Sequence, residues 1–197
     1  MIDPVRCVTN LSTGKLGWEV VKMFYSHGYN VHSIVANTIF ERETLPELIE
    51  IEQKDYEEFY SYIKKLKTNS FSGLIHLVAA SDFTPETSET KISSKKDFKL
   101  LFTRSQKIIE LENIKKFPFK IICKLTDNED DETLKKVKEY MQKNKFNKLF
   151  WNSHASSWKS SSHTGNFVSY VDKEFHLEKI SGKKNIALKF LHELQNA

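Results

Sequence analysis

The chain has 197 residues, 39% of them hydrophobic and 28% charged, a balance that is typical of one folded domain and excludes a disordered chain. The formal charge of +4 arises from 30 basic and 26 acidic residues, an excess too small to indicate nucleic-acid binding. The sequence shows no signal-peptide pattern and no run of about 18 apolar residues, so we expect a cytoplasmic protein without a membrane span.

The first half of the chain predicts helices that alternate with strands. Apolar residues at helical spacing predict a helix over 15–27, and Gly28 is placed to end it. A short apolar strand is expected at 29–36, and another near 49–51 precedes a helix with aromatic residues on one face. Residues 72–85 predict an apolar strand that runs into a loop.

The second half continues this alternation after a polar segment. Residues 86–102 have no helical period, and we expect an extended flap that projects from the sheet. The remaining expected elements are a helix over 104–116, a strand at 119–126, a helix over 130–145, a strand at 147–152, a mobile loop at 153–166, a hairpin at 167–181 turning at Asp172 and Lys173, and a closing helix over 183–197. The alternation predicts an α/β domain with parallel strands, spanning residues 1–197.

The helix predicted from Lys15 directly follows the letters TNLSTG. Its unpaired backbone N–H groups form a generic anion site, and Gly14 and Gly17 permit close backbone approach. Ser12 or Thr13 can cap the helix. The T-G-x-x-G pattern fits equally well a capped helix whose glycines serve only packing.

Other candidate side chains are ambiguous when taken alone. Asp82 follows the carboxyl end of the strand LIHLVAAS, the edge where α/β sheets bind ligands, but an aspartate there also suits a turn. Lys91 lies in a charged stretch, where most lysines are solvated. The seven histidines and two cysteines show no ligand spacing, so we expect no metal site formed by protein side chains. His154 and His163 flank a serine-rich segment without a G-x-S-x-G elbow, which favours a loop.

Three motifs taken together point to one family. The segments DPVRCVTNLSTGKLG, VAASDFTP and KISS closely resemble, in order and spacing, the phosphopantothenate–cysteine ligases of coenzyme A biosynthesis, in their stand-alone bacterial form. The resemblance implies a Rossmann-like three-layer fold with a mostly parallel sheet, a flap around 86–102, and a C-terminal hairpin plus helix. It also implies a homodimer.

The resemblance implies a two-step ligation. A nucleoside triphosphate with Mg²⁺ activates the carboxylate of 4′-phosphopantothenate; bacterial members typically use CTP, and ATP stays open. An acyl-cytidylate and pyrophosphate form, after which the amine of cysteine attacks the acyl carbon and displaces CMP. Such a site needs donors for the charge that develops on the acyl oxygen.

Five residues correspond to the substrate side of the family's site. The family's intermediate-stabilising asparagine corresponds to Asn10, whose amide can donate to the acyl-nucleotide. Arg6 matches the arginine of the same motif and is expected in the phosphopantothenate pocket or its supporting network. Ser12, Thr13 and Gly14 complete the expected substrate-binding loop.

Five others correspond to the nucleotide side. Asp82 matches the aspartate of a family turn that contributes to nucleotide recognition, with Val78 and Ala79 just before it. Lys91 matches the first lysine of the family's flap, where a cation neutralises charge as pyrophosphate leaves. Lys143 corresponds, by a looser alignment, to a later nucleotide-contacting lysine.

The chain also departs from the family. Members carry an apolar strand and a G-G-T loop immediately before the D-P-V-R motif, and neither is found here. In a parallel sheet such a strand is central and buried on both faces, so we expect a gap in the sheet, or its filling by another segment or a second chain. Ile122 and Cys123 stand where the family commonly has Gly-Phe, and WNSHA keeps only Asn152 of an A-N-D motif.

These departures leave two interpretations open. The chain is a ligase whose sequence starts late, or it is a degenerate, non-catalytic homologue that binds phosphopantothenate or nucleotide without turnover. A third and weaker interpretation is an NAD(P)-binding protein of the short-chain-reductase type, because that class shares T-G-x-x-G; the Tyr-x-x-x-Lys pair of such enzymes is not found where it is needed.

Overall fold

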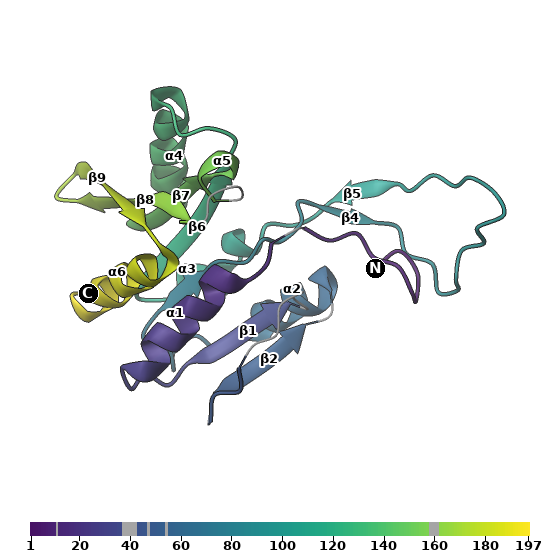
Figure 1. Ribbon diagram of the computed structural model, residues 1–197, viewed down its shortest axis with the longest axis horizontal. Coiled ribbons are helices and arrows are strands. Elements are labelled where there is room, and N and C mark those ends of the chain that lie inside the picture. The colour runs from purple at the N-terminus through teal and green to yellow at the C-terminus, as the bar shows by residue number, and fades with distance from the viewer. Residues whose placement is uncertain (11, 37–42, 47, 54, 158–161) are drawn as a thin grey trace.

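A computed structural model describes the chain except for residues 11, 37–42, 47, 54 and 158–161 (Figure 1). Its helical elements are α1 (Lys15–Ser26), α2 (Tyr56–Lys65), the 3-10 turn η1 (Ile108–Glu110), α3 (Glu112–Lys115), α4 (Asp131–Asn144), α5 (His154–Ser157) and α6 (Lys183–Gln195). Its strands are β1 (His32–Ala36), β2 (Ile49–Gln53), β3 (Leu74–His76), β4 (Phe83–Pro85), β5 (Phe102–Arg104), β6 (Lys120–Thr126), β7 (Lys148–Ser153), β8 (Thr164–Val171) and β9 (Glu174–Ser181). None of the described helices has the length and apolar character needed to cross a membrane.

The main sheet has five strands in the order β3-β6-β7-β8-β9. Strands β3, β6 and β7 pair in parallel, and the β8–β9 hairpin continues the sheet in antiparallel pairing. Asp172 and Lys173 form the hairpin turn with φ of 51° and 67°, the left-handed conformation that a two-residue turn needs to match strand twist. The predicted C-terminal hairpin and closing helix are therefore confirmed.

Helices cover the main sheet on both faces. Ile121 of β6 packs in a cluster with α1 and α6, while the next residue, Ile122, packs with Phe146 on the opposite face. Leu149 and Phe150 of β7 divide in the same way, between the cluster containing α4 and the cluster containing α6. Because successive strand residues point to opposite faces, apolar strands of this kind are buried on both. The three-layer α/β fold is confirmed.

Strands β1 and β2 form a separate parallel pair. Helix α2 follows β2, and Phe59 and Ile63 of this helix pack in a cluster with Ile34 of β1 and Leu74 of β3. In the described parts of the chain no strand pairing joins β1 to β3. The gap expected from the sequence is therefore present between these two strands.

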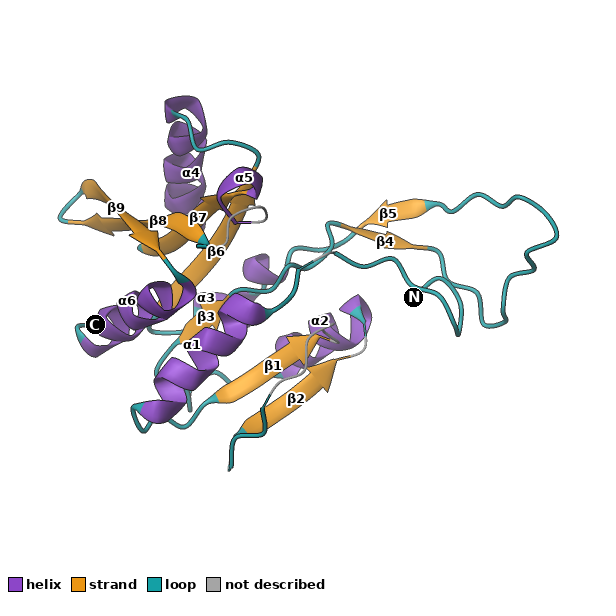
Figure 2. Cartoon of the chain, viewed as in Figure 1, coloured by secondary structure: helices purple, strands orange, loops and turns teal. Residues whose placement is uncertain are grey.

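An extended arm leaves the body of the molecule. Strands β4 and β5 pair antiparallel at its base, residues 86–101 form the rest, and the N-terminal segment runs alongside (Figure 2). The amide of Ser88 donates to the carbonyl of Ile2 at 2.8 Å, which ties the two segments together. The predicted flap is confirmed.

The prediction of one helix over 104–116 is wrong. Arg104 ends strand β5, and only η1 and the single turn α3 are helical. Leu111 separates them with an extended backbone (φ −62°, ψ 136°), and the side-chain amide of Asn113 is held by the carbonyl groups of Ile63 and Leu66 in and after α2. The contacts with α2 thus fix the turn that follows the break at Leu111.

The segment predicted as a loop, 153–166, contains regular structure at both ends. Helix α5 begins at His154 and β8 at Thr164, while 158–161 lie outside the described residues. The carboxylate of Glu129 accepts hydrogen bonds from the Ser153 amide (2.8 Å) and the Asn166 side chain (2.9 Å), and also from Ser156. One acidic side chain from another loop thus fixes a segment whose composition predicts a loop.

Candidate functional site

The start of α1 forms a backbone site for an anion. Gly14 is the N-cap, with φ of 73°, a conformation that favours glycine, and its carbonyl accepts the Trp18 amide at 3.0 Å. No side chain caps the helix; Thr13 Oγ1 lies only within a long 3.4 Å of the Lys15 amide. The expected cap at Ser12 or Thr13 is therefore replaced by Gly14, which leaves N–H groups of the first turn open to a ligand.

Asn10 joins this loop to the carboxyl end of β3. Its side-chain Nδ2 donates to the carbonyl of Ala79 at 2.6 Å, although the two residues are 69 positions apart. Val78 directly precedes this contact and lines the same cavity as Asn10, Ser12 and Gly14. The structure thus brings together the predicted substrate-side loop and two of the predicted nucleotide-side residues.

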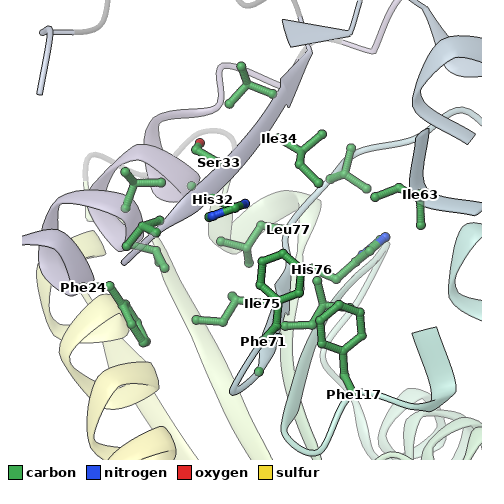
Figure 3. Close-up of a pocket in the computed structure, with 18 of the residues that line it drawn as sticks. Phe24, His32, Ser33, Ile34, Ile63, Phe71, Ile75, His76, Leu77 and Phe117 are labelled. Atoms are coloured by element: carbon green, nitrogen blue, oxygen red, sulfur yellow. The ribbon is translucent and has the colours of Figure 1, made fainter. Parts of the chain in front are cut away.

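A cavity of about 650 Å³ extends from this point between β1 and β3 (Figure 3). The N-terminal loop contributes Thr9, Asn10, Ser12 and Gly14 to its lining. The rest of the lining is mostly apolar and comes from α1, β1, α2, β3 and the segment after α3. Figure 3 shows Ile75 of β3 and Leu77, just after this strand, on the side of Phe24, and His76 turned toward Ile63 and Phe117.

The D-P-V-R motif forms a closed turn on the arm. Arg6 Nε donates to the Asp3 carboxylate at 2.9 Å, and Arg6 Nη2 donates to Asp3 and to the Ile92 carbonyl (2.7 Å). The amides of Val5 and Ile92 donate to the same carboxylate, each at 3.0 Å. Hydrogen bonding from Arg6 holds the pKa of Asp3 well below its usual range, against the opposing effect of burial. Arg6 is thus held in the Asp3–Arg6 turn, and its expected part in the phosphopantothenate pocket or its supporting network stays a prediction.

Two predicted lysines do not converge with Asn10 within one chain. Lys91 is exposed on the arm, next to Ile92 in the Asp3–Arg6 turn. Lys143 lies in the last turn of α4, before β7 begins. Since α4 connects the parallel strands β6 and β7, its end lies at the amino edge of the sheet, opposite the edge where Ala79 follows β3.

Asp82 lies beyond β3 at the carboxyl edge, near charged and phenolic groups. Its side chain is exposed, and its backbone carbonyl accepts the Ser105 amide at 2.9 Å. Burial, then Glu57, Tyr60 and Asp82, raise the pKa of Tyr56 to about 12, so this phenol stays a protonated hydrogen-bond donor at neutral pH.

Lys124 is a cation at this edge that the sequence interpretation missed. It lies on β6 with its Nζ 4.5 Å from the centre of the Tyr140 ring. Burial, followed by the charge of Lys107, lowers the pKa of Lys124, while Asp82 acts in the opposite direction. The feature of the sequence that could have identified it is a lysine inside the apolar strand KIICKLT. Burying an ammonium there is unfavourable unless it reaches a partner or an anion.

The thiol of Cys123 is not a reactive group of this site. Burial raises its pKa to about 12, so the thiolate that acts as a nucleophile is not populated at neutral pH. Its Sγ lies 3.9 Å from Asn152 Oδ1, an amide that also contacts His163. In the part of the chain that the structure describes, no three His, Cys, Asp or Glu side chains gather as metal ligands.

Comparison with known sequences gives a family match over the whole chain. The profile described as "DNA/pantothenate metabolism flavoprotein C-terminal domain" matches residues 1–197. The coenzyme A biosynthesis bifunctional protein CoaBC of Methanocaldococcus jannaschii is 28% identical over 197 residues, which cover 93% of this chain and 44% of the relative. The chain thus spans less than half the length of that curated relative.

Comparison with solved structures gives the same fold. The DNA/pantothenate metabolism flavoprotein from Streptococcus pneumoniae superimposes with a TM-score of 0.81 at 24% identity, covering 100% of this chain and 93% of the other. A Cab2 variant in complex with phosphopantothenate-cysteine superimposes with a TM-score of 0.68 at 16% identity, covering 98% of this chain and 81% of the other. At these identities the likeness establishes the fold, and the Rossmann-like expectation is confirmed.

Proposed function

Because the chain belongs to the DNA/pantothenate metabolism flavoprotein C-terminal domain family, we propose that it is a phosphopantothenate–cysteine ligase of coenzyme A biosynthesis. The observation that carries the proposal is the contact between Asn10 and Ala79, which holds a side-chain amide at the carboxyl end of β3 beside the start of α1. Ligands of α/β sheets bind at this edge.

The proposed first step is activation of the 4′-phosphopantothenate carboxylate. A carboxylate oxygen attacks the α-phosphorus of CTP, the bond to pyrophosphate breaks, and an acyl-cytidylate forms. The open N–H groups at the start of α1 stabilise anionic oxygens, and the Asn10 amide turns from Ala79 toward the acyl-cytidylate oxygen. Lys124 supplies a positive charge at the same edge.

The proposed second step is attack by the amine of cysteine on the acyl carbon. CMP leaves as the new C–N bond forms, and the amine gives up a proton. A Mg²⁺ ion that travels with a nucleoside triphosphate needs only one or two protein carboxylates, and exposed Asp82 fits that requirement at this edge. When bound, the ion neutralises charge on the phosphates.

We further propose that two copies of the chain form the working site. The arm and the N-terminal segment expose large apolar side chains that a second copy can cover, namely Val5, Val8, Phe83, Phe98, Leu101 and Phe102. Lys91 is separated from Asn10 within one chain, so it acts at the site of the other copy, where its charge meets departing pyrophosphate.

Pyrophosphate release in the presence of 4′-phosphopantothenate, CTP, Mg²⁺ and cysteine tests the activity. We expect Asn10→Ala to reduce the rate by about 100-fold or more, the usual effect of removing one oxyanion donor. Asn196→Ala is the matched control, because the Asn196 amide also donates to a backbone carbonyl, that of His192 at 2.8 Å, but lies at the C-terminus. Replacing CTP with ATP measures nucleotide preference.

One alternative is a non-catalytic homologue, which the departures from the family at Ile122, Cys123 and the WNSHA segment favour. In that case calorimetry detects binding of 4′-phosphopantothenate or CTP, while no pyrophosphate is released. Pyrophosphate release that Asn10→Ala abolishes and Asn196→Ala preserves rejects this alternative; ligand binding with no release rejects the ligase.

A further inference from the structure

We propose that Tyr56 and Tyr60 of α2 are positioning residues that hold the base of the arm through Gln106 and so set where Lys91 reaches. The two hydrogen bonds from these tyrosines to Gln106 are called the hinge contact. The inference deepens the proposed function and rests on it, because Lys91 is taken to act at the site of a second copy; the hinge contact itself does not depend on that activity.

Gln106 is the point where α2 binds the chain at the base of the arm. The Tyr56 hydroxyl donates to the backbone carbonyl of Gln106, and the Tyr60 hydroxyl donates to its side-chain Oε1. The two tyrosines are four positions apart and lie on one face of α2, where their rings stack with centres 6.0 Å apart. An exposed glutamine is therefore held at two points, which fixes its orientation as well as its position.

The residue before Gln106 closes the arm at its base. The Ser105 amide donates to the carbonyl of Asp82 at 2.9 Å, and Ser105 Oγ lies 3.4 Å from Thr84 Oγ1. Asp82 directly precedes β4 and Ser105 directly follows β5, so this contact joins the two ends of the arm. Helix α2 thus holds the arm at the place where both of its strands leave the body (Figure 2).

Helix α2 is a firm support for the hinge contact. Asp55 caps it by accepting a backbone amide of the first turn at 3.0 Å. Phe59 and Ile63 of α2 pack in one buried cluster with Ile108, which follows Gln106 by two positions. This packing does not involve the two hydroxyl groups, so the hydrogen bonds to Gln106 orient the base of the arm while apolar contacts keep α2 in place.

The carboxylate of Asp82 lies near the hinge contact. Burial is the main cause that raises the pKa of Tyr56 to about 12, and the charge of Asp82 is one of the smaller causes. The Tyr56 phenol therefore stays protonated and donates to Gln106 at neutral pH. One contact thus fixes both the residue proposed to bind Mg²⁺ and the arm that carries Lys91.

The length of the arm makes its angle important. Lys91 follows Asp82 by nine positions, which span up to roughly 30 Å in an extended chain. A rotation of about 10° at the base moves a group at that distance by about 5 Å. A misplacement of about 1 Å is enough to lower a catalysed rate by about 100-fold. A loosened hinge contact should therefore affect the step in which Lys91 takes part.

Hydrogen exchange of the full 197-residue chain tests the hinge contact without reference to activity. The double variant Tyr56→Phe, Tyr60→Phe keeps both rings and loses both donors. We expect the Ser105 amide to exchange about tenfold faster or more, since a hydrogen bond contributes roughly a factor of ten. The Glu86 amide, which donates to the Leu101 carbonyl within the arm at 2.9 Å, should keep its rate, because the arm turns without opening.

A matched variant and two outcomes decide this test. Tyr25→Phe removes the hydroxyl of a half-buried tyrosine on α1 that has no hydrogen bond to the described part of the chain, and it should change neither rate. Equal exchange at Ser105 in the unmodified chain and the double variant overturns the proposal. Faster exchange at both Ser105 and Glu86 also overturns it, because the arm then unfolds instead of turning.

Pyrophosphate release tests the link to Lys91. In the double variant we expect kcat to fall by about tenfold while KM for CTP stays within about twofold, because Lys91 meets the departing pyrophosphate. In a Lys91→Ala chain the two tyrosine substitutions should have no further effect, and additive losses overturn the positioning role. An unmodified chain that releases no pyrophosphate overturns the ligase and the positioning of Lys91 together, whereas exchange at Ser105 still decides the hinge contact.

Discussion

His76 provides a quantitative test of how β3 is buried. Both of its ring nitrogens are buried and have no hydrogen-bond partner in the described part of the structure. Burial disfavours the charged imidazolium and lowers the pKa of His76 from 6.5 to about 4. The folded chain therefore holds a neutral histidine at pH values where the unfolded chain binds a proton.

The sign of the pH effect follows from proton linkage. Between pH 6.5 and 4 the unfolded state binds more protons than the folded state at His76, so the free energy of unfolding falls as pH falls. Each unit of pKa shift corresponds to about 1.4 kcal/mol, and the loss between pH 7.5 and 4.5 amounts to about 2.5 kcal/mol. Above about pH 7.5 both states are almost entirely neutral at this residue, and its contribution is nearly constant.

Urea unfolding followed by tryptophan fluorescence measures this effect. In His76→Leu the loss of stability between pH 7.5 and 4.5 should be smaller than in the unmodified chain by about 2.5 kcal/mol. At pH 7 the variant should also gain about 1 kcal/mol or more, because two unsatisfied polar atoms leave the interior. His176→Leu, the same change at an exposed histidine, is the matched control. Parallel profiles for the unmodified chain and His76→Leu would refute the reasoning.

Three further predictions concern other parts of the molecule. Arg6→Ala removes the partner of a buried carboxylate and should make protease cleavage of the arm about tenfold faster, while exposed Lys91→Ala should leave cleavage unchanged. Glu129→Ala should lower the free energy of unfolding by about 2 kcal/mol in a urea titration at pH 7; an unchanged midpoint contradicts its organising role. Gly165→Ala should lower the free energy of unfolding by about 3 kcal/mol or more, because a Cβ there meets a phenyl ring and a backbone carbonyl oxygen at 2.8 Å. A Cβ at Gly17 meets nothing within 4 Å, so Gly17→Ala should stabilise α1 by up to about 1 kcal/mol. Thermal unfolding compares the two glycine variants.

Glu129 and His76 affect the free energy of unfolding in different pH ranges. Burial opposes ionisation of Glu129, but hydrogen bonds from Ser156, Ser153 and Asn166 outweigh it and hold the pKa below its ordinary value. Its contribution to stability is therefore present at neutral pH and is lost below the range where an ordinary glutamate titrates. The losses from the two residues occur in different pH windows.

Local sequence pattern was sufficient to predict most of the helices and strands. The helix at 15–27, the strand at 119–126 and the hairpin turn at Asp172 and Lys173 follow from periodicity, glycine placement and turn chemistry, which act over a few residues. The D-P-V-R and T-N motifs pointed to the family because they combine several rare residues in fixed order. Asn10 was selected from the sequence for the same reason.

Interactions between distant segments decided the rest. The helix expected over 104–116 is interrupted at Leu111, and Asn113 just after the break binds carbonyl groups in and after α2. The segment 153–166 is organised by Glu129 from another loop. The environment of the Lys124 ammonium depends on Tyr140 and on neighbouring charges, which no local sequence pattern encodes.

The sequence by itself determined the α/β class and the family, because each depends on patterns of residues close together in the chain. Only the tertiary structure decided which predicted residues meet. It joined Asn10 to Ala79, placed Lys91 on the arm and Lys143 at the opposite edge, and opened a cavity between β1 and β3. The physical reason is that sheet order and strand direction set these distances, and both arise from pairing between segments far apart in the sequence.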